Sequence, residues 1–116
     1  MIAVIFEVEP HPEHQDRYLE IAASMRALVE QVDGFISVER FASLTNEGKL
    51  VSLSFFRDET AVEDWRKLVA HRGAQAEGRE RLFKNYRLRV ASVLRDYGMN
   101  ERDEAPADSR ARHDVS

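Results

Sequence analysis

The chain has 116 residues, with 17 basic and 21 acidic side chains and a formal net charge of −4 at pH 7. This length suits one domain with one hydrophobic core, and the acidic balance argues against binding to nucleic acid. Cysteine is absent, which excludes disulfides, thiolate metal sites and a cysteine nucleophile. No apolar run approaches the roughly 20 residues of a transmembrane helix, so we expect a cytoplasmic protein without a membrane partner.

The first predicted elements are a strand and a long helix. Residues 2–8 are rich in β-branched and aromatic side chains and follow no basic region, which indicates a strand and not a signal peptide. Apolar residues then recur at helical spacing from Tyr18 to Val32, and Gly34 is placed to end that helix.

A hairpin and a second helical region follow. The strands are predicted at residues 35–43 and 49–58, around an Asn-Glu-Gly turn signal. Asp58 is a candidate N-cap for a helix that carries Trp65 on its apolar face, and a further helical piece is expected over residues 70–85.

The last part of the chain divides into a strand and a tail. Residues 86–98 alternate and predict the final strand, whereas residues 99–116 are polar and charged with almost no apolar content. We therefore expect one domain over residues 1–98, followed by a flexible charged tail over residues 99–116 with no role in the core.

The predicted order β-α-β-β-α-β is the ferredoxin-like arrangement of an α+β protein. Two helices cover only one face of a four-stranded antiparallel sheet, and a water-exposed second face is normally polar. In the first strand both alternating sets are apolar, with Ile2, Val4 and Phe6 in one set and Ala3 and Ile5 in the other. Because exposing apolar surface costs about 25 cal/mol per Å², we predict a homodimer whose sheets pack face to face.

Three segments resemble the antibiotic biosynthesis monooxygenase family. They are DGF at residues 33–35, SFFRDETAVEDWR at residues 54–66 and AHRGAQAEGRERLFKNYRLRVASVLRDY at residues 70–97. Trp65 and the following His-x-x-x-Gln are the more specific marks. The resemblance implies a dimeric α+β barrel, and the family includes cofactor-free quinone-forming monooxygenases, haem-degrading oxygenases and quinol oxygenases.

The haem-degrading branch of this family has an Asn in the first strand, the same Trp, and a His iron ligand ten positions after that Trp. Here Gln75 stands at the ligand position, and an ungapped comparison puts Glu7 at the position of the Asn. Glutamine is a poor haem ligand. His11 and His14 have no third candidate ligand nearby, so no metal site is predicted either. We expect no cofactor, with haem binding and degradation as the alternative.

Trp65 and His71 are the candidate catalytic residues, and each has two interpretations. Trp65 is either a core aromatic of an amphipathic helix or, as the resemblance implies, part of the wall of an aromatic substrate pocket, with an indole N–H free to donate. His71 is either a cap or surface residue or a catalytic base, which a nearby helix N-terminus would keep neutral at pH 7.

Gln75 and Arg79 follow His71 at intervals of four residues and therefore share its side of a helix. Both are candidate substrate-binding residues, and Arg79 would stabilise a phenolate or enolate, although a solvated helix face is the stronger interpretation for Arg79. The remaining candidates for a dry aromatic substrate wall, beside Trp65, are Phe6, Phe55 and Phe83.

These residues favour one function and leave others open. An oxygenase without a cofactor must take its electrons from the substrate, which an electron-rich aromatic anion supplies to O₂ inside a dry pocket. We therefore predict a monooxygenase that acts on a small aromatic or quinol-type molecule. The alternatives are haem degradation and a non-catalytic dimer that binds a small molecule in the same pocket.

Overall fold

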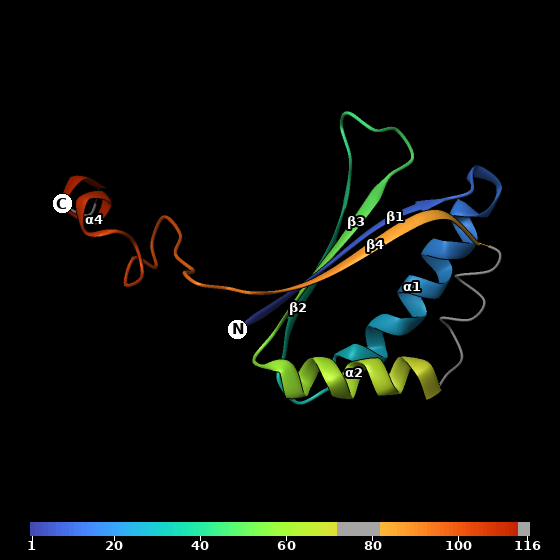
Figure 1. Cartoon of the computed structure of the whole chain (residues 1–116), viewed down its shortest axis with the longest axis horizontal. Helices are drawn as coiled ribbons and strands as arrows, with labels where there is room; N and C mark the ends of the chain where they lie inside the picture. Colours follow the sequence, from blue (N-terminus) through green and yellow to red (C-terminus); the bar gives the residue numbers. More distant parts are fainter. Residues whose placement is uncertain (72–81, 114–116) are drawn as a thin grey trace.

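A four-stranded antiparallel sheet forms the centre of the computed structural model, which describes residues 1–71 and 82–113. The central strands are β1 (Ile2–Pro10) and β3 (Leu50–Phe56), and the edge strands are β2 (Phe35–Ala42) beside β3 and β4 (Phe83–Ser92) beside β1. This arrangement confirms the predicted α+β ferredoxin-like fold (Figure 1). The sheet of the single chain is open and does not close into a barrel.

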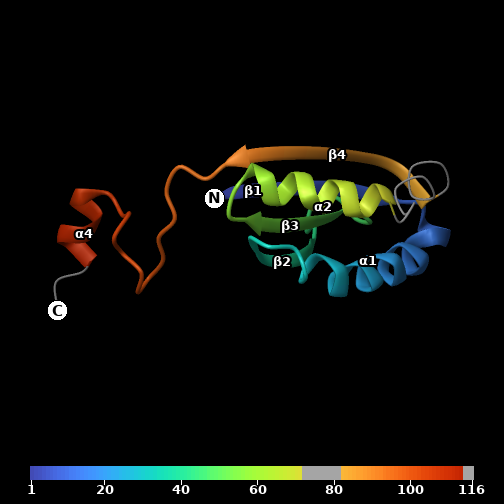
Figure 2. The same cartoon turned by 90° about the horizontal axis from the view of Figure 1, so that it is seen from below.

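The helices cover one face of this sheet (Figure 2). A short 3-10 helix η1 (Pro12–His14) leads into α1 (Gln15–Val29), and α2 (Glu59–His71) follows β3. Asp58 caps α2 as predicted, since the Ala61 amide donates to its Oδ1 at 2.9 Å. This hydrogen bond is the main cause that holds the pKa of the Asp58 carboxyl below its usual value.

The core between sheet and helices consists of two separate clusters. The first lies where α1 meets β1, and its buried residues are Val8, Tyr18 and Ala22. The second lies where the end of α1 and the start of α2 meet the sheet, and its buried residues are Val29, Phe56 and Ala61. Partly buried apolar side chains extend both clusters, and Trp65 is one of those that pack on the second.

The central strands also present apolar side chains on the face of the sheet without helices. Strand register and alternation assign it five apolar residues of β1 and β3, which are Ala3, Ile5, Val51, Leu53 and Phe55. Each of these side chains is buried or half-buried. The apolar character on both faces, on which the dimer prediction depends, is therefore present in the structure, whereas the dimer itself stays a prediction.

The last strand differs from its predicted extent. A helical piece was expected to reach residue 85 and the strand to run over residues 86–98, but β4 already begins at Phe83 and ends at Ser92. The cause is the pairing with β1, because Ser92 pairs with Ile2, the first residue of β1. Local propensity cannot indicate this end point.

Beyond β4 the chain leads away from the sheet to a short helix, α4 (Ala107–His113) (Figure 2). The segment predicted as a tail therefore carries local structure. Arg102 donates to the Gly98 carbonyl at 3.0 Å and to the Ser109 hydroxyl at 2.8 Å, and it lies 5.4 Å from the centroid of the Tyr97 ring. The division into a domain at 1–98 and a tail at 99–116 stays a prediction.

Gly34 and Gly48 offer a matched test of how tightly α2 packs on the turn between α1 and β2. Gly34 has φ +94°, and a Cβ there would lie 2.9 Å from the Cβ of Ala61, whereas Gly48 has φ +87° and open space around it. We expect Gly48→Ala to cost only the backbone strain of about 1 kcal/mol. Gly34→Ala should lower the free energy of unfolding clearly more, because α2 must also move.

Urea unfolding of the two variants measures this difference. Equal losses of stability would contradict the expectation, since they would show that the start of α2 moves away from the turn at no cost.

Candidate functional site

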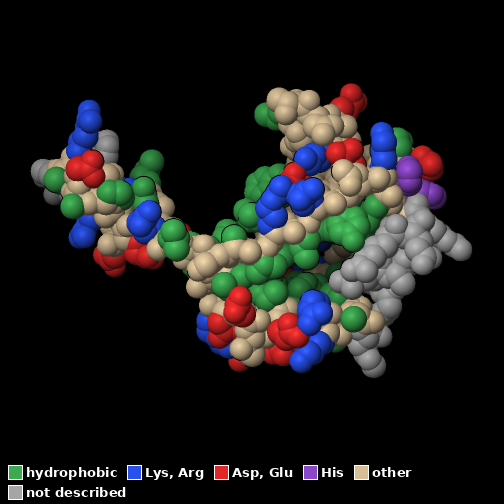
Figure 3. Space-filling model, viewed as in Figure 1, with side chains coloured by type: hydrophobic (Ala, Val, Ile, Leu, Met, Phe, Trp, Pro, Cys, Tyr) green, Lys and Arg blue, Asp and Glu red, His purple; other side chains and the backbone are tan. Residues whose placement is uncertain are grey.

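A polar break divides the core layer between sheet and helices. Alternation places Leu50, Ser52, Ser54 and Phe56 on the helix-facing side of β3. Leu50 belongs to the first cluster and Phe56 to the second, so the two serines lie between the clusters. Their small side chains fill little of this layer. On the surface, a hollow with hydrophobic side chains on both sides opens between β4 and α2 (Figure 3).

Arg40 belongs to the same break. It pairs with Ser52, which in turn pairs with Phe6, so its side chain lies on the helix-facing side of β2. Its Nε atom is buried and has no hydrogen-bond partner among the described residues. The guanidinium lies close enough to the hydroxyl of Tyr18, a residue that is only 6% exposed, to act on its pKa. Burial raises the pKa of Tyr18 above its usual value of 10.0, and the charge of Arg40 only partly opposes this.

Sequence reasoning missed Tyr18 and Arg40 as a polar pair. The available signal was the alternating set Ile36, Val38, Arg40 and Ala42, in which a cation interrupts an apolar series. The bulge at the start of β2, between Phe35 and Ser37, obscured which set faces the helices.

Aromatic rings gather on the first-cluster side of the break. The ring centroids of Phe6 and Phe83 are 5.9 Å apart, and those of Tyr18 and Phe83 are 5.6 Å apart. Tyr86 joins them at 5.8 Å from Phe6 and remains 42% exposed. The structure thus brings together two of the predicted wall residues, Phe6 and Phe83, together with two tyrosines that the sequence did not single out.

The other predicted wall residues lie apart from this aromatic group. Trp65 is half-buried on α2 and packs on the second cluster, so it faces the same layer from the far side of the polar break. Phe55 pairs with Ala3 and lies on the helix-free face of the sheet, because its neighbour Phe56 is the residue that points to the helices. Phe55 is therefore not part of the same layer.

Three predicted site residues fall outside this description. His71 is the last residue of α2, but its side chain lies outside the described residues, as do Gln75 and Arg79. Their predicted roles as base and substrate-binding groups stay predictions.

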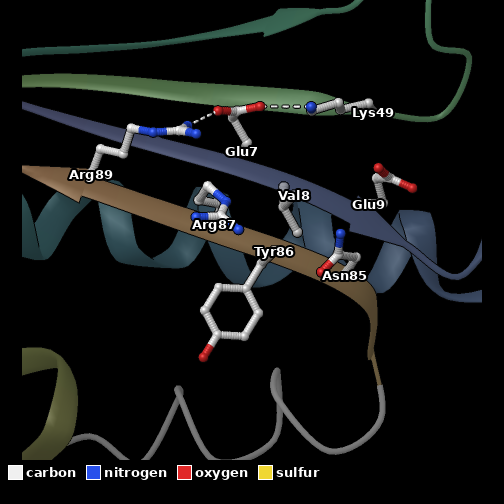
Figure 4. A pocket seen from close by; sticks show the side chains of 8 residues that line it. All are labelled: Glu7, Val8, Glu9, Lys49, Asn85, Tyr86, Arg87 and Arg89. Carbon is white, nitrogen blue, oxygen red and sulfur yellow. Dashed lines mark hydrogen bonds and ion pairs between the residues drawn. The ribbon is translucent and has the colours of Figure 1, made fainter.

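Glu7 forms an ion-paired group on the helix-free face (Figure 4). Its Oε1 lies 2.6 Å from Nζ of Lys49, and its Oε2 pairs with the guanidinium of Arg89. Lys49 and then Arg89 hold the pKa of the Glu7 carboxyl below its usual value. Hollows of about 200 and 450 Å³ lie beside this group, while Tyr86 points to the opposite side of the sheet.

The described part of the chain lacks two further classes of site. No group of three or more His, Cys, Asp or Glu residues there is placed to hold a metal ion. Among the described helices, none has the length and apolar character needed to cross a membrane.

The match to known proteins decides the family. Residues 1–77 match the family described as antibiotic biosynthesis monooxygenase. The chain belongs to the antibiotic biosynthesis monooxygenase family.

The chain covers different fractions of the length of its relatives. Jasmonate monooxygenase ABM of Pyricularia oryzae is 41% identical over 117 residues, which is all of this chain but 54% of that protein. The chain thus spans about half the length of that relative. The uncharacterized protein YqjZ of Bacillus subtilis is 31% identical over 80% of this chain and 79% of its own length.

A solved structure shares the fold at low identity. SnoaB, a cofactor-independent oxygenase from Streptomyces nogalater, superposes with a TM-score of 0.69 at 9% identity, covering 82% of this chain and 94% of that one. At this identity the likeness establishes the fold alone.

The structure also shows which first-strand residue of this family member faces the layer beneath the helices. The sequence comparison placed Glu7 at the position of the Asn in the haem branch, but Glu7 pairs with Lys49 and Arg89 on the helix-free face. Its neighbour Phe6 faces the helices instead and packs on the first cluster.

The lowered pKa of Glu7 gives a pH-dependent prediction. Its carboxylate stabilises the fold above the usual pKa of 4.5, and this contribution is lost as the pH falls through the lower pKa of the folded state. Glu7→Gln should therefore lower the melting temperature at pH 7, and the difference from the unaltered chain should shrink below pH 4.5.

Thermal unfolding followed by circular dichroism between neutral and acidic pH measures this. Glu47→Gln, which removes the same charge from an exposed turn, serves as the control. A difference for Glu7→Gln that persists undiminished in acid would show that the ion pairs do not carry its stability.

Proposed function

We propose that this chain is the oxygenase domain of a cofactor-independent monooxygenase that acts on a small aromatic or quinol-type molecule. The substrate would bind between the sheet and the helices. The observation that carries the proposal is the divided core, in which aromatic side chains on one side and Trp65 on the other flank a polar break. Family membership and the monooxygenase name of the relative from Pyricularia oryzae support it.

In such a reaction the substrate itself must supply the electrons that reduce O₂. A hydroxyl group of the substrate loses its proton, and the electron-rich anion passes an electron to O₂. The two radicals combine at a ring carbon that carries a C–H bond. Loss of water then leaves that carbon as a carbonyl, so one oxygen atom enters the product and the other leaves as water.

Each candidate residue has a role in this scheme. Phe6 and Phe83 exclude water from the reacting anion, which strengthens every polar contact inside the pocket. The indole N–H of Trp65 donates to a substrate oxygen. His71 takes the substrate proton, and Gln75 and Arg79 contact the anion; these three roles come from the sequence and the family resemblance.

Oxygen uptake tests this proposal. A panel of hydroquinones is incubated with the protein in chelator-treated buffer. We expect oxygen uptake at one O₂ per substrate and one ¹⁸O atom in the product from ¹⁸O₂. Trp65→Ala should lower kcat/KM by about tenfold, because an aromatic contact worth about 1.4 kcal/mol is lost. Trp65→Phe keeps a ring but lacks the indole N–H, so it should restore only part of the activity.

Two outcomes would contradict the oxygenase proposal. Tight binding of these molecules without oxygen uptake would favour a non-catalytic binding protein. Stoichiometric hemin binding with a sharp Soret band, followed by conversion to a bilin on addition of reductant, would favour the haem-degrading branch.

We also propose a homodimer that buries the helix-free face of the sheet. Leu53 and Phe55 lie near the centre of this face, and an introduced charge there would have to be buried without a partner. Light scattering should give twice the 13.4 kDa mass of the chain, and Leu53→Glu should give the monomer mass. Ala23→Glu adds the same charge on the exposed side of α1 and should leave the dimer intact.

A further inference from the structure

We infer that Arg40 and Tyr18 form an anchor for a carboxylate, and that the substrate of the proposed pocket is a small apolar or aromatic acid whose carboxylate binds the Arg40 guanidinium. This inference deepens the proposed function and rests on its pocket between sheet and helices. It concerns a polar pair for which neither the sequence motifs nor the oxygenase scheme provides a role.

The first argument is one unpaired N–H donor of Arg40, a residue that is half-buried. The Nε–H of Arg40 is buried and lacks a hydrogen-bond acceptor among the described residues. Such a donor costs free energy when it is left unpaired away from water. In the described part of the chain the ion pairs join other cations to their carboxylates, and none of them includes Arg40.

The second argument is the surroundings of the cation. Arg40 lies in one row across the sheet with Ser52, Phe6 and Leu88, all on the helix-facing side. Leu88 at the far end of this row is 54% exposed. The row therefore leads from an open apolar edge at β4 to a cation at β2, which suits a molecule with an apolar body and one anionic end.

The third argument is that the guanidinium is held in place. Tyr18 is anchored in the first cluster beside the guanidinium, and Nε of Arg40 is itself buried, so the surrounding fold confines the long side chain before any ligand arrives. A preorganised guanidinium loses less entropy on binding, and its planar fork of N–H donors matches the geometry of a carboxylate.

A matched pair of ligands tests this inference. The probes are 2-naphthoate and 2-naphthamide, which share their shape and apolar body and differ in charge. Isothermal titration at pH 7 should show naphthoate binding about tenfold more tightly than naphthamide, as expected for a charged hydrogen bond of about 1.4 kcal/mol.

Variants then locate the source of this preference. Arg40→Gln should abolish the preference for naphthoate while the affinity for naphthamide stays unchanged. Arg40→Lys keeps the charge but loses the planar fork, so it should retain only part of the preference and serves as the test if Arg40→Gln does not fold. Arg87→Gln removes a cation from the exposed helix-free side of β4 and should leave the preference intact.

The results separate this inference from the oxygenase proposal. Equal affinities of the unaltered protein for the two probes would overturn the carboxylate anchor, as would a preference that survives in Arg40→Gln. A variant that only loses stability while keeping the preference would show that Arg40 serves the fold alone. None of these binding results depends on oxygen uptake, so the monooxygenase proposal would stand or fall separately.

Discussion

The pairing of β1 with both β3 and β4 is the constraint on which the rest of the structure depends. Because β1 lies between these strands, its register decides which residues of all three face the helices. One set is led by Phe6 and Val8 and builds the core, whereas the alternate set contains Ile5 and Glu7 and faces away. A shift by one residue would exchange these sets and remove the aromatic group from the layer beneath the helices.

The two faces that result have different physical tasks. The helix-facing side is divided, with apolar clusters at both ends and small or polar side chains between them. The other side is apolar around Ile5 and Leu53 but carries Glu7 between two cations. An ion-paired group of this kind satisfies its own charges, so it suits a face covered by a second sheet better than it suits catalysis.

Among the described residues, Arg40 is a clear place where the core departs from what packing alone would select. A methionine or leucine there would join the two clusters and leave no N–H unpaired. Departures of this kind concentrate at sites where function opposes stability. The same reasoning does not apply to Asp58 or to Gly34, whose contacts are explained by a helix cap and by close packing.

The sequence by itself determined the order of strands and helices, the cap at Asp58 and the apolar character of both faces of the first strand, because these depend on local spacing and propensity. Tertiary structure decided that Phe56 and not Phe55 meets the helices, that β4 ends opposite Ile2 at the start of β1, and that Arg40 lies close to Tyr18. These outcomes depend on strand register and on contacts between residues distant in the chain. Such contacts leave no periodic signal in either partner alone, which is why only the folded chain reveals the polar break that defines the candidate site.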